Sequence, residues 1–160
     1  MAIYVTGLMS LLLSALSLGP SFAHVLEAPP RLGMWPPALW REATVFHGQF
    51  EYFAIVGAPL DIAAILVAGW LAFLLRGERH AFHFALAGAL LLACGLAAWL
   101  AVVAPVNSVL ATWRPGPIPE DFDAVRARWE TGHMIVAAAK ALGFVALSVA
   151  LLSPRRPASG

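Results

Sequence analysis

Three histidine–carboxylate pairs have spacings that place both side chains on one face of a helix. Two of the pairs are three residues apart, His24/Glu27 and Glu130/His133, and the third, His47/Glu51, is four residues apart. Residues three or four apart are neighbours on a helix surface, so each pair can direct an imidazole and a carboxylate at one point. Such side chains transfer protons and bind metals. The spacing therefore predicts acid–base or metal chemistry where these helices meet.

The Glu-x-x-His spacing is also the one by which ferritin-like bundles hold iron or manganese between facing helices. The candidate metal ligands are His24, Glu27, Glu130 and His133, with His47 and Glu51 as further candidates. Nitrogen and oxygen ligands without a thiolate suit Fe, Mn, Zn or Cu. A haem held by His133 together with His24 or His47 is the alternative cofactor.

Two interpretations without a cofactor stay open for the same residues. A carboxylate near a helix N-terminus is favoured by the helix dipole, which accounts for Glu51 and Glu130. A buried polar network, or simple decoration of the membrane interface, therefore fits the pattern as well. In that case Arg126 or Arg128 would pair with a nearby glutamate.

The composition shows which solvent surrounds the helices that carry these residues. The 160 residues are 61% hydrophobic and 12% charged, with a formal net charge of +1, whereas a soluble domain is about half apolar and about a quarter charged. This excludes a soluble single-domain enzyme, a disordered chain and a nucleic-acid binder. Cys94 is the single cysteine, so one chain forms neither a disulfide nor a thiolate cluster, and we expect it in the core.

Four stretches that are almost free of charge are each long enough to cross a bilayer. They predict helices over about 3–24, 52–75, 83–104 and 133–152, within a single domain over 1–160. We expect an all-α integral membrane four-helix bundle with up-down-up-down topology. A short amphipathic helix over about 120–129 would precede the last span and could cover the site. A signal peptide cleaved after residue 23 is the alternative for the first stretch, although it lacks a basic start.

Basic residues and tryptophans predict how the bundle lies in the membrane. Arginines dominate the short loop after the second span and the C-terminal tail, which places both termini in the cytoplasm of a bacterial inner membrane. Those arginines are Arg76, Arg79, Arg155 and Arg156. The long loops carry Trp35, Trp40, Trp113 and Trp129, most of which we expect to face lipid as interfacial anchors. The expected partners are the bilayer and a small apolar molecule, and a homo-oligomer stays open.

The expected topology gathers the unusual polar residues at one end of the bundle. The histidine–carboxylate pairs and Asn107 all fall where the long loops join the helices. Two further charges lie deeper in the spans, Asp61 and Lys140. Lys140 is seven residues from His133 and shares its helix face, so we expect an Asp61–Lys140 ion pair below the site, because charges inside a membrane need a partner. Gly88 and Gly95, seven residues apart, predict a close helix contact.

Three short motifs, in order, resemble one known family. They are the stretch 18–32 with its Ala-His-x-x-Glu-x-Pro pattern, Pro105-Val106-Asn107 followed by Trp113, and the stretch 126–133 with its Arg-x-x-Trp-x-x-x-His pattern. Together they resemble the bacterial branch of the anthrone-oxygenase-like membrane proteins, most of which are called a domain of unknown function. The resemblance implies a four-helix membrane protein, and some fungal relatives oxidise polyketide anthrones to anthraquinones with O₂. By this resemblance the residues that matter most are Asn107, Trp129 and His133, while His24, Glu27, Arg126 and Glu130 match the bacterial branch and His47 departs from it.

The leading functional prediction is a membrane oxidoreductase that acts on a small apolar or aromatic molecule. His133 would be a base or ligand, with His24, Glu27 and Glu130 as ligands or proton carriers. Asn107 would bind the substrate or oxygen, Trp129 would line the pocket, and Arg126 would contact a cofactor. The alternatives are a non-catalytic binding protein, transport accessory or complex subunit with a structural polar cluster, and a haem-binding electron carrier.

Overall fold

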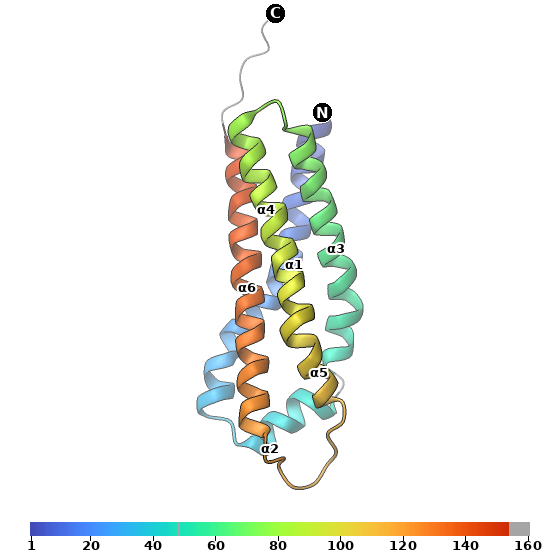
Figure 1. Ribbon diagram of the computed structural model, residues 1–160, viewed down its shortest axis with the longest axis vertical. Helices are drawn as coiled ribbons and strands as arrows, with labels where there is room; N and C mark the ends of the chain where they lie inside the picture. Colours follow the sequence, from blue (N-terminus) through green and yellow to red (C-terminus); the bar gives the residue numbers. More distant parts are fainter. Residues whose placement is uncertain (48, 154–160) are drawn as a thin grey trace, which may run out of the picture.

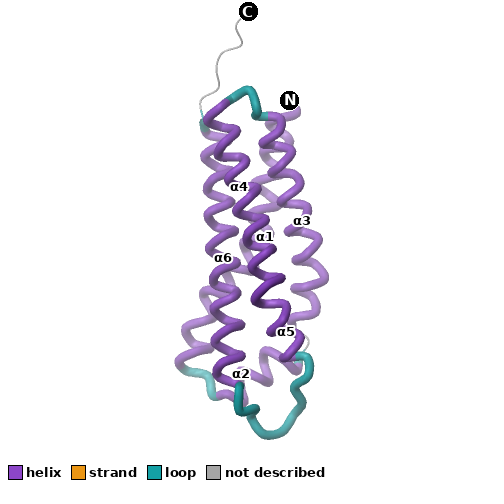
Figure 2. Tube along the Cα trace, in the orientation of Figure 1, coloured by secondary structure: helices purple, strands orange, loops and turns teal. Residues whose placement is uncertain are grey.

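The structure is a computed structural model that describes residues 1–47 and 49–153, with side chains for all of these except residues 49–52 and 54. Within these ranges every regular element is a helix, and no strand is present (Figure 2). The elements are α1 (Ala2–Gly33), α2 (Pro37–Arg41), the π-helical η1 (Glu42–Phe46), α3 (Gln49–Leu74), α4 (Arg79–Ala98), the π-helical η2 (Trp99–Val103), α5 (Ala104–Leu110) and α6 (Phe122–Leu152). The predicted all-α class is confirmed.

Four long helical segments lie side by side and form the bundle (Figure 1). α1 packs against α3 and α6, and α4 packs against the same two helices. The start of α1 and the turn between α3 and α4 lie at one end of the bundle. The other end, which we call the loop end, carries α2, α5 and the connection from α5 to α6 (Figure 1).

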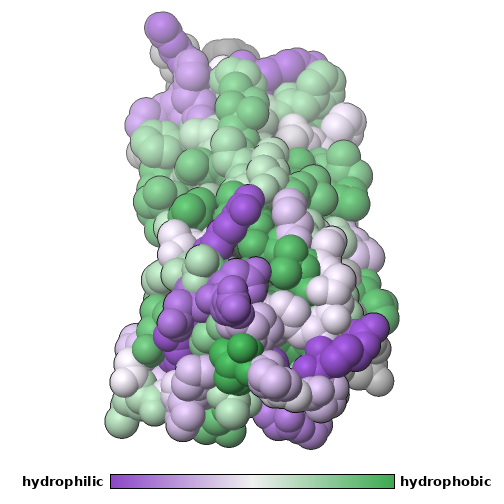
Figure 3. All heavy atoms as spheres, turned by 60° about the horizontal axis from the view of Figure 1, so that its bottom comes forward, coloured by the Kyte–Doolittle hydropathy of each residue, from purple (hydrophilic) through white to green (hydrophobic). Residues whose placement is uncertain are grey.

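The sides of the bundle are apolar enough to face lipid. Four helical segments are long and apolar enough to cross a membrane: Ala2–Gly33, Ile55–Leu74, Arg79–Leu110 and Phe122–Leu152. Large apolar side chains such as Leu66, Leu100 and Leu142 point outward and are mostly exposed. Hydrophilic residues gather toward the ends, with an apolar band between them (Figure 3). Because so large an exposed apolar surface is unfavourable in water, it indicates a membrane protein.

The helices run further toward the loop end than the sequence predicted. α1 continues to Gly33 and α6 begins at Phe122, where the charge-free stretches ended near 24 and began near 133. A charge-free stretch marks only the apolar part of a helix, whereas the helix itself continues wherever charged side chains find partners. The expected separate helix over 120–129 is therefore wrong, because these residues lead into α6 and form its first turns. His24 and His133 consequently lie inside long helices rather than at their ends.

Glycines bring α4 and α6 into close contact, as predicted for Gly88 and Gly95. A Cβ atom built on Gly88 would lie 2.7 Å from Cγ of Leu147, and one on Gly95 would lie 3.4 Å from Cγ of Lys140. Leu147 is fully buried and has no space to swing away. Cys94 is exposed, which corrects its expected place in the core. It directly precedes Gly95 on the helix and so points away from the contact that Gly95 makes.

We expect Gly88→Ala to lower the free energy of unfolding by about 1–3 kcal/mol, because the added methyl overpacks the α4–α6 contact. Gly69→Ala is the matched control, since a Cβ there meets nothing within 4 Å. Alanine favours a helix over glycine by up to about 1 kcal/mol, so the control should be neutral or stabilising. Unfolding of both variants in detergent measures the difference. Equal stabilities would show that the two helices are not in close contact at Gly88.

Candidate functional site

Two histidines from different helices meet face to face inside the bundle. The rings of His24 on α1 and His133 on α6 stack with their centroids 4.0 Å apart and their planes 21° apart. The indole of Trp129 stands edge-on to both rings, at 5.2 Å from His24 and 4.3 Å from His133. The structure thus brings together three of the residues that the sequence singled out.

The inward face of α1 explains why α6 can come so close. Small residues recur there every three or four positions, and the buried ones are Ser10, Ser14, Ser17, Ser21 and Ala28, with Gly7 at the start. This spacing keeps them on one face of the helix. Two hydroxyl groups on this face bond to carbonyls of the same helix: that of Ser14 to Ser10 at 2.7 Å and that of Ser21 to Ser17 at 3.4 Å. The close approach sets His24 directly against His133.

Three buried polar atoms near this stack have no hydrogen-bond partner among the described residues. They are Nε2 of His133, Oε2 of Glu130 and Nε of Arg31. A buried polar atom without a partner costs about 1–3 kcal/mol, so a native structure that keeps one calls for an explanation. Because these atoms are inaccessible even to water, they are sealed inside the packed bundle and do not open to a ligand.

Trp40 holds Glu130 on the side of α2. Nε1 of Trp40 donates to Oε1 of Glu130 at 3.0 Å, and both side chains are almost completely buried. Trp40 also meets Trp129 and Phe122 edge-on, each at 5.6 Å. Trp40, Trp113 and Trp129 are therefore core residues, and the expectation that most of the loop tryptophans face lipid is wrong. The helices extend past the apolar stretches, which turns these rings inward.

Arg31 is a residue that the sequence prediction missed. It donates to Oε2 of Glu27, and its other terminal nitrogen lies 3.4 Å from Nδ1 of His24. Its guanidinium lies over the rings of Trp35 and Trp129. The signal was its spacing of four residues from Glu27 and seven from His24, which becomes visible only once α1 is known to run beyond residue 24.

The carboxylates of the predicted metal set are bound to other donors. Among the side chains that the structure describes, no group of three or more histidine, cysteine, aspartate or glutamate residues is placed to hold a metal ion. Glu27 pairs with Arg31 and Glu130 with Trp40, so only His24 and His133 of the set come together. The arrangement therefore does not support the four-residue metal site.

The histidines are also not arranged as a haem-binding pair. Imidazoles bind iron through a nitrogen in the ring plane, whereas the rings of His24 and His133 lie face to face. His47 is exposed and lies 3.4 Å from Glu42 in η1. Glu51 lies outside the residues whose side chains are described.

Asn107 supports the site from outside, whereas Arg126 does not. Oδ1 of Asn107 accepts a hydrogen bond from Nε1 of Trp129 at 2.9 Å, which fixes the indole against the histidine stack. Arg126 pairs with Asp123 at 2.9 Å, rather than with Glu27 or Glu130. Asn107 is thus a positioning residue, and Arg126 does not reach the histidines.

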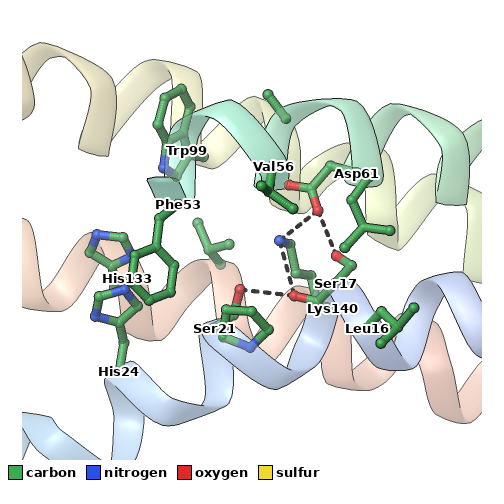
Figure 4. A pocket seen from close by; sticks show the side chains of 15 residues that line it. Leu16, Ser17, Ser21, His24, Phe53, Val56, Asp61, Trp99, His133 and Lys140 are labelled. Atoms are coloured by element: carbon green, nitrogen blue, oxygen red, sulfur yellow. Dashed lines mark hydrogen bonds and ion pairs between the residues drawn. The ribbon is translucent and has the colours of Figure 1, made fainter. Parts of the chain in front are cut away.

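A cavity of about 290 Å³ lies beside the stack, between α1, α3, η2 and α6. Its walls are mostly apolar, and Figure 4 shows the histidines on one side and the charged residues further along. The polar and aromatic lining residues include His24, Ser17, Phe53, Asp61, His133 and Lys140. The sequence prediction included neither Phe53 nor Ser17, because neither carries a charge or belongs to a spaced motif.

The predicted ion pair below the stack is confirmed. Nζ of Lys140 lies 2.8 Å from Oδ1 of Asp61, and Oγ of Ser17 donates to the same oxygen at 2.5 Å. Nζ also lies 3.5 Å from the backbone carbonyl of Ser17 (Figure 4). The three residues link α1, α3 and α6, and their charges cancel, so the cavity as a whole is close to neutral.

No family model, curated protein or solved structure matches the chain. The resemblance to the anthrone-oxygenase-like proteins therefore stays a prediction that rests on the motifs alone. The cavity and its polar residues are the features from which a function can be inferred.

Proposed function

We propose that this chain crosses a bacterial inner membrane four times, up-down-up-down, and binds a small, mostly apolar molecule in the cavity between α1, α3 and α6. The outward apolar faces of the four long helices support the membrane placement. The arginine-rich turn after α3 supports placing that turn and both termini in the cytoplasm. An aromatic molecule would then reach the cavity from the bilayer.

The observation that carries the proposal is a mostly apolar cavity that is lined at one end by the imidazoles of His24 and His133. Ligand sites combine mostly apolar walls with a few polar groups that fix orientation. A cavity of about 290 Å³ is near the lower end of the usual range, about 300–1,000 Å³, and favours a molecule of only a few rings. Phe53 and Trp99 supply aromatic wall for such a molecule.

The reaction that suits this site is oxidation of an anthrone-like substrate by O₂. His133 would take a proton from the acidic ring methylene, and the resulting carbanion would give its electrons to O₂. The balanced overall reaction is anthrone plus O₂ to anthraquinone plus water. His24, stacked on His133, and Trp129, held by Asn107, would keep the imidazole oriented. The residues themselves supply only the base and the apolar pocket.

Binding without catalysis is the second candidate, and the ion pair favours it. Asp61, Lys140 and Ser17 satisfy one another inside the bundle, as a purely structural cluster does. A membrane-binding or transport-accessory protein would need only the cavity and this cluster. The two candidates differ in whether oxygen is consumed.

Oxygen uptake by the detergent-purified protein with anthrone as the probe separates the two candidates. We expect uptake matched one to one by anthraquinone, and we expect His133→Ala to lower the rate about 100-fold, the usual contribution of a general base. His83→Ala is the control, because His83 is exposed in the first turns of α4, and its Nδ1 lies 2.6 Å from the carbonyl oxygen of Arg79. Saturable anthrone binding without any uptake would instead identify the non-catalytic protein.

A further inference from the structure

Lys140 is the single lysine of the chain, and it lies inside the bundle. The ten lysine and arginine residues comprise nine arginines and this one lysine. An arginine keeps its charge in proteins, whereas the amine of a lysine can lose its proton and then attack a carbonyl carbon. The chain therefore places its one side-chain amine at the wall of the cavity.

The stem of Lys140 is packed, and its amine end reaches the cavity. A Cβ atom built on Gly95 would lie 3.4 Å from Cγ of Lys140, so α4 packs closely against the stem. Lys140 lines the cavity and extends from α6 toward Asp61 on α3, which lines it as well (Figure 4). The amine is thus held in one place, which favours reaction with a bound molecule.

The ammonium group of Lys140 has one N–H group that a ligand can use. An ammonium group has three N–H donors. Within the residues that the structure describes, Nζ has two acceptors, Oδ1 of Asp61 at 2.8 Å and the backbone carbonyl of Ser17 at 3.5 Å. A carbonyl oxygen of a bound molecule can accept the third hydrogen bond, which brings its carbon next to Nζ.

Asp61 is placed to take the proton that the amine must lose. Its Oδ1 lies 2.8 Å from Nζ and also accepts the hydroxyl of Ser17 at 2.5 Å. In a condensation with an aldehyde, Nζ bonds to the carbonyl carbon, and the carbonyl oxygen leaves as water with two of the three ammonium protons. The product is a protonated imine with the same single positive charge as lysine. The charge of Asp61 is therefore balanced before and after the reaction.

This charge balance favours aldehydes over acyl donors. An ester would convert the amine into a neutral amide and leave the carboxylate of Asp61 buried without a partner, which is strongly unfavourable. The cavity walls are mostly apolar, with Leu16, Phe53 and Val56 among them, so a charged aldehyde does not fit either. The class of ligand that suits Lys140 is a small, apolar aldehyde.

We propose that Lys140 binds small apolar aldehydes covalently, as a protonated imine with Asp61 as its counter-ion. This activity goes beyond the proposed function, because it needs neither oxygen nor the histidine stack. The two share only the requirement that the cavity admits a small apolar molecule. A purely structural ion pair needs no amine, since an arginine would give Asp61 two hydrogen bonds instead of one.

Reductive trapping of 1-naphthaldehyde on the folded, unaltered protein in detergent tests the proposal. Cyanoborohydride reduces a protonated imine to a stable amine, and peptide mass mapping then locates the added naphthylmethyl group. The α-amine of Met1, a fully exposed residue, is the internal reference for the reactivity of the reagent. We expect label at both Lys140 and Met1. We also expect 1-naphthol, which has the same rings but no carbonyl, to slow labelling at Lys140 alone.

Two controls show whether the cavity selects the aldehyde. For the charged 4-formylbenzenesulfonate, the ratio of label at Lys140 to label at Met1 should be at least about tenfold lower than for 1-naphthaldehyde, because a charge is costly in an apolar cavity. Lys140→Arg keeps a positive charge beside Asp61 but has no amine that condenses. This variant should carry label only at Met1.

The outcomes separate this inference from the proposed binding function. Label at Lys140 only after the chain is unfolded, while 1-naphthol still binds the folded protein saturably, would overturn the inference and leave the binding function standing. Equal label ratios for the two aldehydes would also overturn it, because the amine would then be reached from outside the cavity. If 1-naphthol neither binds nor slows labelling at Lys140, the proposed binding function is wrong as well.

Discussion

Asp61→Leu should lower the free energy of unfolding by about 3–5 kcal/mol, because it leaves the ammonium of Lys140 buried without a partner. The side chains of both residues are nearly inaccessible, and their nearest atoms are 2.8 Å apart. Ser17 offers Lys140 only a backbone carbonyl at 3.5 Å, which cannot replace a carboxylate. The variant should therefore unfold at much lower denaturant in detergent.

The double variant with Lys140→Leu should recover most of that loss, because two leucines fill the space without a buried charge. Asp123→Leu is the surface control. Asp123 also pairs with an arginine, Arg126, but its side chain is 82% exposed, so the loss should be below about 1 kcal/mol. If Asp61→Leu proved no less stable than the double variant, Lys140 would not depend on Asp61.

The distribution of charge along the sequence was enough to predict the helices but not their ends. Long stretches without charge have one stable form in lipid, so four helices are expected from them. The ends near Gly33 and Phe122 could not be predicted in this way. There the helix continues through charged residues such as Arg31, whose burial depends on Glu27 and on the tryptophans around it.

The spacing of residues along the helices predicted which of them come together, but it did not predict their hydrogen-bond partners. His24, His133, Asp61 and Lys140 come together as their positions along the helices suggested. Glu130 does not join them, because the indole of Trp40 offers it a hydrogen bond on another face. The hydrogen bond between Trp40 and Glu130 depends on α2. This short helix lies in a loop, and no periodic pattern in the sequence predicts it.

Filling the cavity should abolish binding without harming the fold. Gly57 on α3 lines the cavity, and a Cβ atom built there meets nothing within 4 Å. Gly57→Leu would therefore place its side chain in open space at the cavity wall. Leucine is also the better helix former by up to about 1 kcal/mol, so stability should not fall. Loss of binding in this variant would then reflect occupied space alone.

Gly69→Leu is the matched control for this test, because Gly69 lies on the same helix, also has open space around it, and does not line the cavity. It should bind as the unaltered protein does. Both variants should show the unfolding stability of the unaltered protein, which is checked in the same detergent.

The most direct test of the proposed cavity site is equilibrium binding of 1-naphthol to the unaltered protein, Gly57→Leu and Gly69→Leu. The site between the histidine stack and the ion pair predicts saturable binding to the unaltered protein and to Gly69→Leu, and no measurable saturable binding to Gly57→Leu. Unchanged binding to a folded Gly57→Leu variant would contradict it, since the molecule would then bind somewhere other than this cavity.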